Sequence, residues 1–330
     1  MSIDEKINIG ELKQSLLEGN IKALSKSITL VESSSYKHFE MAQVLINSIM
    51  PQTGKSVRIG ITGIPGAGKS TFIESFGLLL LEKGHKVAVL AVDPSSSISR
   101  GSILGDKTRM EKLSRHKNCF IRPSPSGGSL GGVANKTRES ILICEAAGYD
   151  RILVESMGVG QSEVELRTMV DFLLLLLIPG SGDELQGLKK GIVEIADLIA
   201  INKSEGENKD RAKLTAIEYS SALKYLNQFT EGWKVKVKMC SAITGEGLME
   251  ILQSLEEFEK FTKSEKIFER NRNEQLSLWM DKIFMENLKR KYLSSPDIKN
   301  YRSELKAKVI TNELSPSAAA ELLMKRIVGD

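Results

Sequence analysis

The chain has 330 residues, of which 41% are hydrophobic and 27% charged, a composition typical of soluble globular proteins and unlike that of disordered or collagenous chains. Its 46 basic and 42 acidic residues give a net charge of +4, too small over this length to predict a nucleic-acid-binding surface. The N-terminus lacks the basic-then-apolar order of a signal peptide, and the most apolar run, 172–178, is far shorter than a bilayer span. Three separated cysteines in hydrophobic segments are typical of buried, reduced thiols. We therefore expect a folded cytoplasmic protein with neither a membrane nor a nucleic acid as partner.

Residues 9–50 carry apolar side chains at helical spacing and predict a small helical segment at the start of the chain. Pro51 and Gly54 are expected to end it. We assign residues 1–52 to this N-terminal helical segment.

Seven short apolar runs, separated by helical patterns, follow in the middle of the chain. They are 57–62, 87–92, 119–122, 151–155, 172–178, 198–202 and 235–241. Strands that alternate with helices predict an α/β fold, with a mostly parallel sheet flanked by helices. The run 172–178 shows no alternation, as expected for a central strand buried on both sides. We assign residues 53–263 to this domain.

The strand pattern stops at about residue 264. Residues 267–292 predict one long, charged, amphipathic helix, and two shorter helices are expected after it. The first of these should end near Thr311, and the second should begin at 315–317, where Pro316 suits a first helical turn. Residues 264–330 therefore form a helical arm, for which we predict a role in dimerisation because its apolar residues exceed what one helix can hide.

Residues 63–70 read Gly-Ile-Pro-Gly-Ala-Gly-Lys-Ser and directly follow the first predicted strand. They match the G-x-x-x-x-G-K-S/T pattern of a phosphate-binding P-loop in its strand-to-helix context. Lys69 is expected to reach the β- and γ-phosphates, Ser70 to bind Mg²⁺, and Thr71 to touch the α-phosphate. The glycines allow backbone N–H groups to approach phosphate oxygens. The predicted phosphate-binding residues are Gly63, Pro65, Gly66, Ala67, Gly68, Lys69, Ser70 and Thr71.

Acidic residues are needed beside Ser70, because Mg²⁺ prefers octahedral oxygen coordination. Asp93 follows the strand 87–92 and Glu155 ends the strand 151–155, so both are expected at the sheet edge where ligands bind in parallel folds. Asp106 lies in a loop, where an acid is more often solvated, and its assignment depends on the family resemblance below. The predicted metal site comprises Ser70, Asp93, Asp106 and Glu155, and the three acids are also assigned to the catalytic site. Gly158, just after Glu155, can turn an N–H onto the γ-phosphate.

The sequence Asn202-Lys203-Ser204-Glu205 follows a hydrophobic strand and resembles the N-K-x-D element that reads guanine. Asn202 is expected to contact the base, Lys203 to pack along it, and Glu205 to accept hydrogen bonds from the ring N–H and amino groups. Ser241 and Ala242 follow the next strand and resemble the last guanine-contacting loop. This pattern favours GTP over ATP.

Five further segments closely resemble the MeaB/ArgK family, which includes the human methylmalonic aciduria type A protein. They are 92–96, 102–110, 131–133, 158–163 and 182–187, and the resemblance runs from about residue 15 to the C-terminus. It implies a homodimeric GTPase of the SIMIBI class. Such a protein chaperones an adenosylcobalamin-dependent acyl-CoA mutase, typically methylmalonyl-CoA mutase, by gating cofactor delivery and by protecting or reactivating the enzyme.

The resemblance also implies roles for individual residues. It places Asp93, Asp106 and Glu155 around the metal and the water, and makes 182–191 a mobile loop that responds to the partner. Lys189 in that loop is expected to swing toward the nucleotide, with its neighbour Lys190 as the alternative. The chain departs from the family pattern at Glu205, where aspartate is usual, at Arg100, where glycine is usual, and at Ser156, where threonine is common.

Two other functions compete with the regulatory GTPase. An ATP-dependent kinase or transport-linked ATPase needs an acceptor pocket with a positioned base, and the sequence shows no separate substrate domain. A nickel-type metallochaperone needs clustered Cys or His ligands, whereas His38, His85 and His116 are scattered.

Overall fold

The computed structural model describes residues 8–33, 35–92, 110–123, 130–156, 161–181, 190–293 and 295–328. The chain divides into two compact units, Met1–Glu269 and Arg270–Asp330. Within the described parts of the chain, no helix is both long enough and apolar enough to cross a bilayer.

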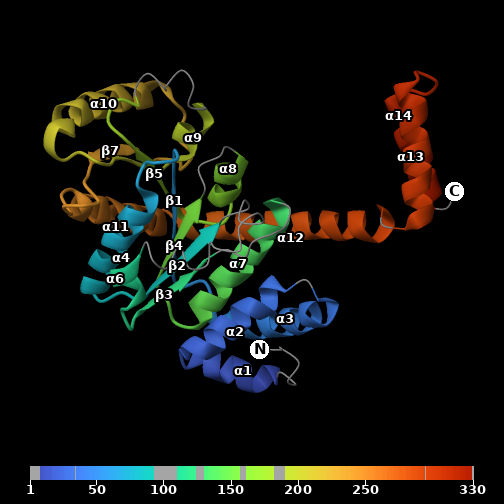
Figure 1. The fold of residues 1–330 in the computed structure, drawn as a ribbon, viewed down its shortest axis with the longest axis horizontal. Coiled ribbons are helices and arrows are strands. Elements are labelled where there is room, and N and C mark those ends of the chain that lie inside the picture. Colours follow the sequence, from blue (N-terminus) through green and yellow to red (C-terminus); the bar gives the residue numbers. More distant parts are fainter. Residues whose placement is uncertain are drawn as a thin grey trace. The chain divides into compact units, whose positions relative to one another are not determined.

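A seven-stranded parallel sheet forms the centre of the first unit, with the strand order β3-β2-β4-β1-β5-β6-β7 (Figure 1). All seven predicted strands are confirmed, and so is the α/β fold. The strands are β1 (Val57–Gly63), β2 (Val87–Val92), β3 (Cys119–Arg122), β4 (Arg151–Ser156), β5 (Phe172–Leu177), β6 (Leu198–Ile201) and β7 (Lys236–Met239). Because β1 lies between β4 and β5, the P-loop that follows it is central.

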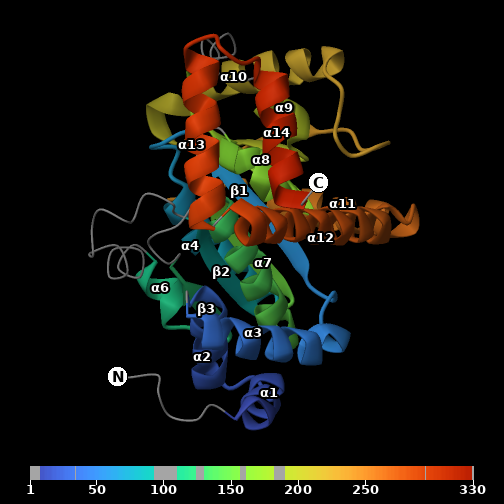
Figure 2. The same cartoon turned by 90° about the vertical axis from the view of Figure 1, so that its right-hand side faces the viewer.

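Helices cover both faces of this sheet (Figures 1 and 2). One face carries α4 (Lys69–Glu82), α6 (Glu111–Ser114) and α11 (Leu248–Ser264), and the other carries α7 (Leu130–Ala146), α8 (Gln161–Arg167), α9 (Lys190–Ile195) and α10 (Lys209–Ala222). Short 3-10 turns at Gly206–Asn208 and Leu223–Tyr225 flank α10.

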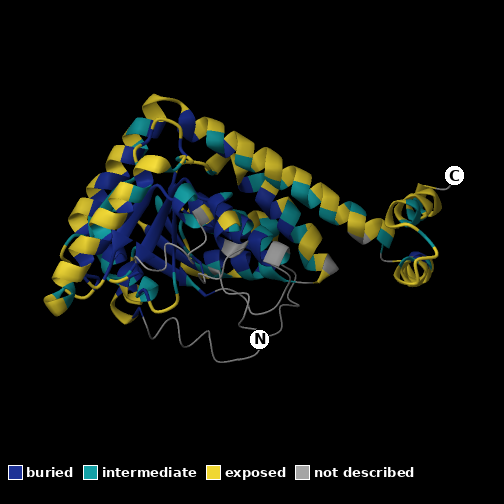
Figure 3. Ribbon diagram, turned by 90° about the horizontal axis from the view of Figure 1, so that it is seen from above, coloured by how far each residue is buried: buried dark blue, intermediate teal, exposed yellow. Residues whose placement is uncertain are grey.

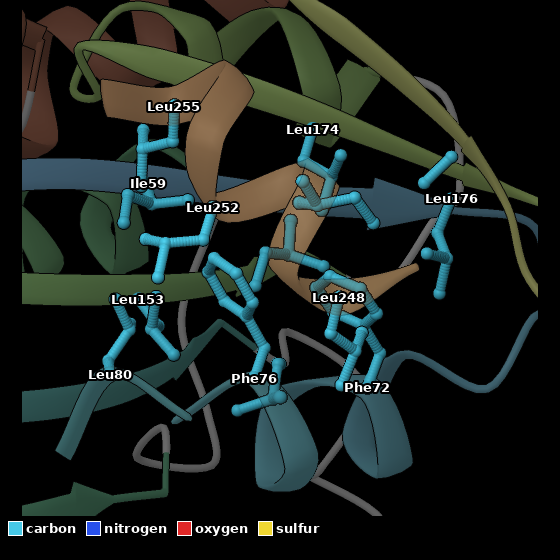
Figure 4. Packing of buried hydrophobic residues seen from close by; sticks show 14 of the residues in the cluster. Ile59, Phe72, Phe76, Leu80, Leu153, Leu174, Leu176, Leu248, Leu252 and Leu255 are labelled. Atoms are coloured by element: carbon cyan, nitrogen blue, oxygen red, sulfur yellow. The ribbon is translucent and has the colours of Figure 1, made fainter. Parts of the chain in front are cut away.

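Strand β5 shows why its sequence lacks alternation. Leu174 and Leu176 belong to the core beneath α4 and α11, where Phe72 and Leu252 also lie (Figure 4). Leu175 and Leu177 belong to the core beneath α9 and α10. Since side chains alternate across a strand, both faces of β5 are buried and every position is apolar.

The N-terminal segment forms the predicted helices, α1 (Ile9–Leu17), α2 (Ile21–Glu32) and α3 (Tyr36–Ile49), before a 3-10 turn at Met50–Gln52. The side chains of Asn8 and Asn20 cap α1 and α2 by accepting backbone N–H groups. Both α2 and α3 pack on α7. Arg122 of β3 forms an ion pair with Glu32 of α2, which fixes these helices to the sheet.

The second unit contains a helical hairpin, α13 (Pro296–Ile310) and α14 (Pro316–Val328). It follows α12 (Ile267–Leu293), which begins just before the boundary between the two units. The three C-terminal helices lie where the sequence predicted them. Ser295 caps α13 by accepting the N–H of Ile298 at 3.2 Å, with Pro296 in the first turn. Helix α14 begins at Pro316, the proline predicted for its first turn.

The prediction that α12 is amphipathic was wrong. Its exposed apolar side chains lie on two opposite sides of the helix, one marked by Leu276, Met280 and Phe284, and the other by Leu278 and Met285. Helical spacing of four residues keeps a set on one side, whereas Leu278 is half a turn away from Leu276. Figure 3 shows this helix largely exposed.

Candidate nucleotide site

Two glycines shape the turn from β1 into α4. A Cβ added to Gly63 would come within 2.1 Å of the carbonyl oxygen of Leu176 on β5, so only glycine fits there. Gly68 has a φ of +86°, which glycine adopts at little cost. The loop therefore turns directly into the N-terminus of α4, whose free N–H groups and positive dipole end favour phosphate.

Lys69 opens α4 and lies partly buried against the loop. Its Nζ donates hydrogen bonds to the carbonyl oxygens of Gly63 at 2.8 Å and Ile64 at 3.3 Å. Burial lowers the pKa of the Lys69 ammonium, and the carboxylates of Glu155 and Glu163 oppose that shift. Lys69 is thus a partly buried cation that two carboxylates influence, at the place where phosphate charge is expected.

Ser70 meets the first of the predicted acids. Its Oγ donates a 3.1 Å hydrogen bond to Oε1 of Glu155, and Glu155 lies opposite Ile61 in the β1–β4 register. Two hard oxygen ligands therefore lie side by side at the phosphate end of the sheet, which suits Mg²⁺. Among the described residues, this site included, no group of three or more His, Cys, Asp or Glu side chains is placed to hold a metal ion.

Asn202 is buried and joins two loops. Its Nδ2 donates to the carbonyl oxygen of Ala67 in the P-loop at 2.8 Å, and its Oδ1 accepts from the N–H of Ala242 at 3.0 Å. Asn202 comes so close to the P-loop that a Cβ on Gly68 would lie 2.8 Å from Nδ2. The phosphate loop and the predicted base loops are therefore one connected structure.

Glu205 is the most informative side chain of the predicted base site. Its Oε2 is buried, and no hydrogen-bond partner for it occurs among the residues that the structure describes. Lys203 before it has a φ of +59°, and the Oγ of Ser204 donates to the carbonyl oxygen of Cys240 at 2.8 Å. Burial, with a smaller contribution from the Glu205 carboxylate, raises the pKa of the Cys240 thiol to about 12. Glu205 is thus an acceptor without a donor.

The loop after β7 is fixed by α4. Ser75 of that helix donates a 2.6 Å hydrogen bond to the carbonyl oxygen of Ala242, while the Oγ of Ser241 accepts the N–H of Thr244 at 3.0 Å. The structure therefore brings together the P-loop, Glu155, Asn202 to Glu205, and the pair Ser241 and Ala242.

Some predicted residues cannot be placed in this arrangement. Asp93, Asp106, Gly158 and Lys189 lie outside the described residues. Two residues were missed by sequence reasoning. Ser75 looks like an ordinary helical serine, and Glu163 was noted only as part of the segment 158–163, although its burial and its effect on Lys69 place it at the site.

The first unit has a P-loop at the centre of a parallel sheet and an acid on the adjacent strand. An asparagine connects the P-loop to the predicted base loops. This combination defines a P-loop nucleotide hydrolase. The profile of the family "Methylmalonyl Co-A mutase-associated GTPase MeaB" matches residues 24–297. The chain belongs to this family of GTPases.

Individual relatives are similar in sequence to this protein along nearly the whole chain. A Caulobacter vibrioides protein described as a GTPase is 46% identical over 318 residues, covering 96% of this chain and 97% of that protein. The mouse protein "Methylmalonic aciduria type A homolog, mitochondrial" is 44% identical over 335 residues, covering 98% of this chain and 81% of the mouse protein. A solved structure of "LAO/AO transport system kinase" is 36% identical, with a TM-score of 0.80 and 99% of both chains covered.

Proposed function

We propose that this GTPase depends on Mg²⁺, hydrolyses GTP to GDP and phosphate, and chaperones an adenosylcobalamin-dependent acyl-CoA mutase of the methylmalonyl-CoA mutase type. The observation that carries the nucleotide part is the bond from Asn202 to the P-loop, together with Glu205 three residues on, whose buried Oε2 has no partner among the described residues. The family membership carries the mutase part.

Guanine recognition follows from the chemistry of Glu205. A buried acceptor without a donor is costly, and guanine offers an N–H and an amino group at the edge that faces such an acid. Adenine presents a ring nitrogen acceptor at the equivalent position, which would repel the carboxylate. The glutamate therefore supports GTP over ATP, with one methylene more than the usual aspartate.

Ser70 and Glu155 would hold the Mg²⁺ ion. Asp93 and Asp106 would supply further oxygen ligands, directly or through water. When bound, the ion neutralises charge between the β- and γ-phosphates. Lys69 binds the same phosphates from the protein side, and Gly158 would contact the γ-phosphate as a switch.

The partner follows from family membership and from the description of the mouse relative. We propose that this protein gates cofactor delivery to its mutase and protects or reactivates that enzyme. The loop 182–191 would respond to the mutase by bringing Lys189 toward the transferring phosphoryl group, as supplied cations do in other GTPases.

The proposed protein is a cytoplasmic homodimer. The exposed apolar side chains on both sides of α12, among them Met280 and Phe284, support this assignment because a dimer interface would cover them. Three buried free thiols, Cys119, Cys144 and Cys240, suit a reducing compartment.

The test measures turnover of GTP and of ATP, each with and without a purified cobalamin-dependent mutase. We expect GTP turnover that the mutase accelerates, and little ATP turnover. Lys189→Ala should keep basal hydrolysis and lose the acceleration, with the exposed Lys213→Ala as its control. Preferential ATP turnover that is insensitive to the mutase would instead support a transport-linked kinase, as the description of the solved relative suggests.

A further inference from the structure

Glu163 is a buried acid that the proposed chemistry has not yet used. It lies in the first turn of α8, and only 3% of the residue is exposed. Its Oε2 is buried, and within the described parts of the chain no group hydrogen-bonds to it. A buried carboxylate oxygen without a donor carries a large desolvation cost, and such exceptions call for a functional explanation.

The position of α8 directs this side chain toward the phosphate site. The helix follows β4 and packs along β4 and β1 (Figure 1), and Leu166, one turn later, lies 3.1 Å from where a Cβ on Gly60 would be. The first turn of α8 is therefore at the carboxyl ends of these strands, where β1 becomes the P-loop. The charge of Glu163 acts on the Lys69 ammonium, as expected from this placement.

The two carboxylates near Lys69 differ in what they bind. Glu155 accepts the Ser70 hydroxyl at 3.1 Å, which places it on the metal side of the site. Glu163 repels phosphate oxygens, which are also acceptors, so its complement must be a hydrogen-bond donor. The donor that hydrolysis requires beside the γ-phosphate is water.

We propose that Glu163 orients the water molecule that attacks the γ-phosphorus, an inference that rests on the proposed GTP hydrolysis. The water oxygen forms the new bond to phosphorus while the bond to the β–γ bridging oxygen breaks, and that oxygen leaves with the electron pair as part of GDP. One water proton stays on the new phosphate. The other passes to the Glu163 carboxylate and then to a phosphate oxygen of the product.

The experiment compares wild type, Glu163→Gln and Glu165→Gln in the full chain. Glu165 lies on the same helix, two residues on, and pairs with Arg138 at 3.5 Å instead of facing Lys69. Single-turnover GTP hydrolysis, the affinities for GDP and a non-hydrolysable GTP analogue, and thermal denaturation are measured for each protein.

For Glu163→Gln we expect the rate of the chemical step to fall by about 10²-fold or more, the usual range for general acid–base groups. Both affinities should stay within about threefold of wild type, and the melting temperature should not fall, because a buried unpaired charge is removed. Glu165→Gln should hydrolyse GTP like wild type.

The inference alone is overturned by a Glu163→Gln rate close to that of wild type, or by a lower rate that losses of affinity and stability accompany in proportion. Glu165→Gln losing the same rate would also overturn it. Absence of GTP hydrolysis by wild type would overturn the proposed function and this inference together.

Discussion

Asn202 and Ala67 lie 135 residues apart and are joined by a 2.8 Å hydrogen bond from the side-chain Nδ2 to the backbone carbonyl oxygen. The same side chain accepts the N–H of Ala242. The P-loop and the proposed base loops therefore share one buried amide, and a change at this amide should affect binding of the whole nucleotide.

Asn202→Ala should weaken binding of GTP and GDP alike. The change leaves the Ala67 carbonyl and the Ala242 N–H without their partner, and each unsatisfied buried group costs about 1–3 kcal/mol. We expect at least about a tenfold loss of affinity and a lower melting temperature, measured by nucleotide titration and thermal denaturation. Asn227→Ala, at an exposed position, is the control. Unchanged affinity for both nucleotides would contradict the bridging role.

Gly68→Ala should be more harmful to nucleotide binding than to folding. The new Cβ would lie 2.8 Å from Asn202 Nδ2, in a backbone with a φ of +86°. Gly84→Ala is a matched control, because Gly84 has a φ of +89° but nothing within 4 Å of its Cβ position. Both variants should lose about 1–2 kcal/mol of stability from the backbone alone. Only Gly68→Ala should lose affinity for the nucleotide. Equal nucleotide affinities in the two variants would exclude a clash between the new Cβ and Asn202 as the cause.

Lys69→Ala should abolish hydrolysis while the fold survives. Removing the cation proposed to bind the phosphates should cost about 10² to 10³ in rate, whereas its loss from a partly buried position in the first turn of α4 leaves the core intact. Rates are measured beside circular dichroism, with the exposed Lys83→Ala at the other end of α4 as control. Wild-type turnover by a folded Lys69→Ala protein would disprove the site.

Substitutions of Glu205 should change the choice of base. Glu205→Asp keeps the acceptor and should preserve or improve the preference for GTP. Glu205→Gln places an amide where guanine offers its donors. It should lower the affinity for GTP by about tenfold or more, since hydrogen bonds to charged groups contribute about 1.5–3 kcal/mol. Competition titrations with GTP and ATP decide this, with the exposed Glu207→Gln as control. Equal affinities of wild type for the two nucleotides would refute the guanine assignment.

Truncation after Ser264 should convert dimers into monomers, because it removes α12 with its exposed apolar side chains and the hairpin that follows. Sedimentation velocity measures the change. In the full chain, the double variant Met280→Glu and Phe284→Glu should have the same effect, whereas Lys289→Glu on the same helix should not. A truncated protein that still sediments as a dimer would place the interface in the first unit.

The strands could be predicted because each is short, apolar and bounded by turns, and the P-loop because its spacing dictates its chemistry. Strand order could not be predicted, since it depends on pairing between distant segments such as Ile61 and Glu155. The burial of Glu163 was missed because a glutamate in a first helical turn usually complements the helix dipole in solvent. For α12, counting apolar residues did not reveal that they lie on two sides.

The contacts of α7 show which N-terminal helices a fragment of this protein would need in order to fold alone. Helices α2 and α3 pack on α7, the amide of Gln43 donates to Glu139 of α7 at 3.1 Å, and Glu32 pairs with Arg122 at the end of β3. A fragment that began at residue 53 would hold every described residue of the nucleotide site and yet expose the covered side of α7 to water. A minimal nucleotide-binding fragment of this chain should therefore include α2 and α3 as well as the sheet.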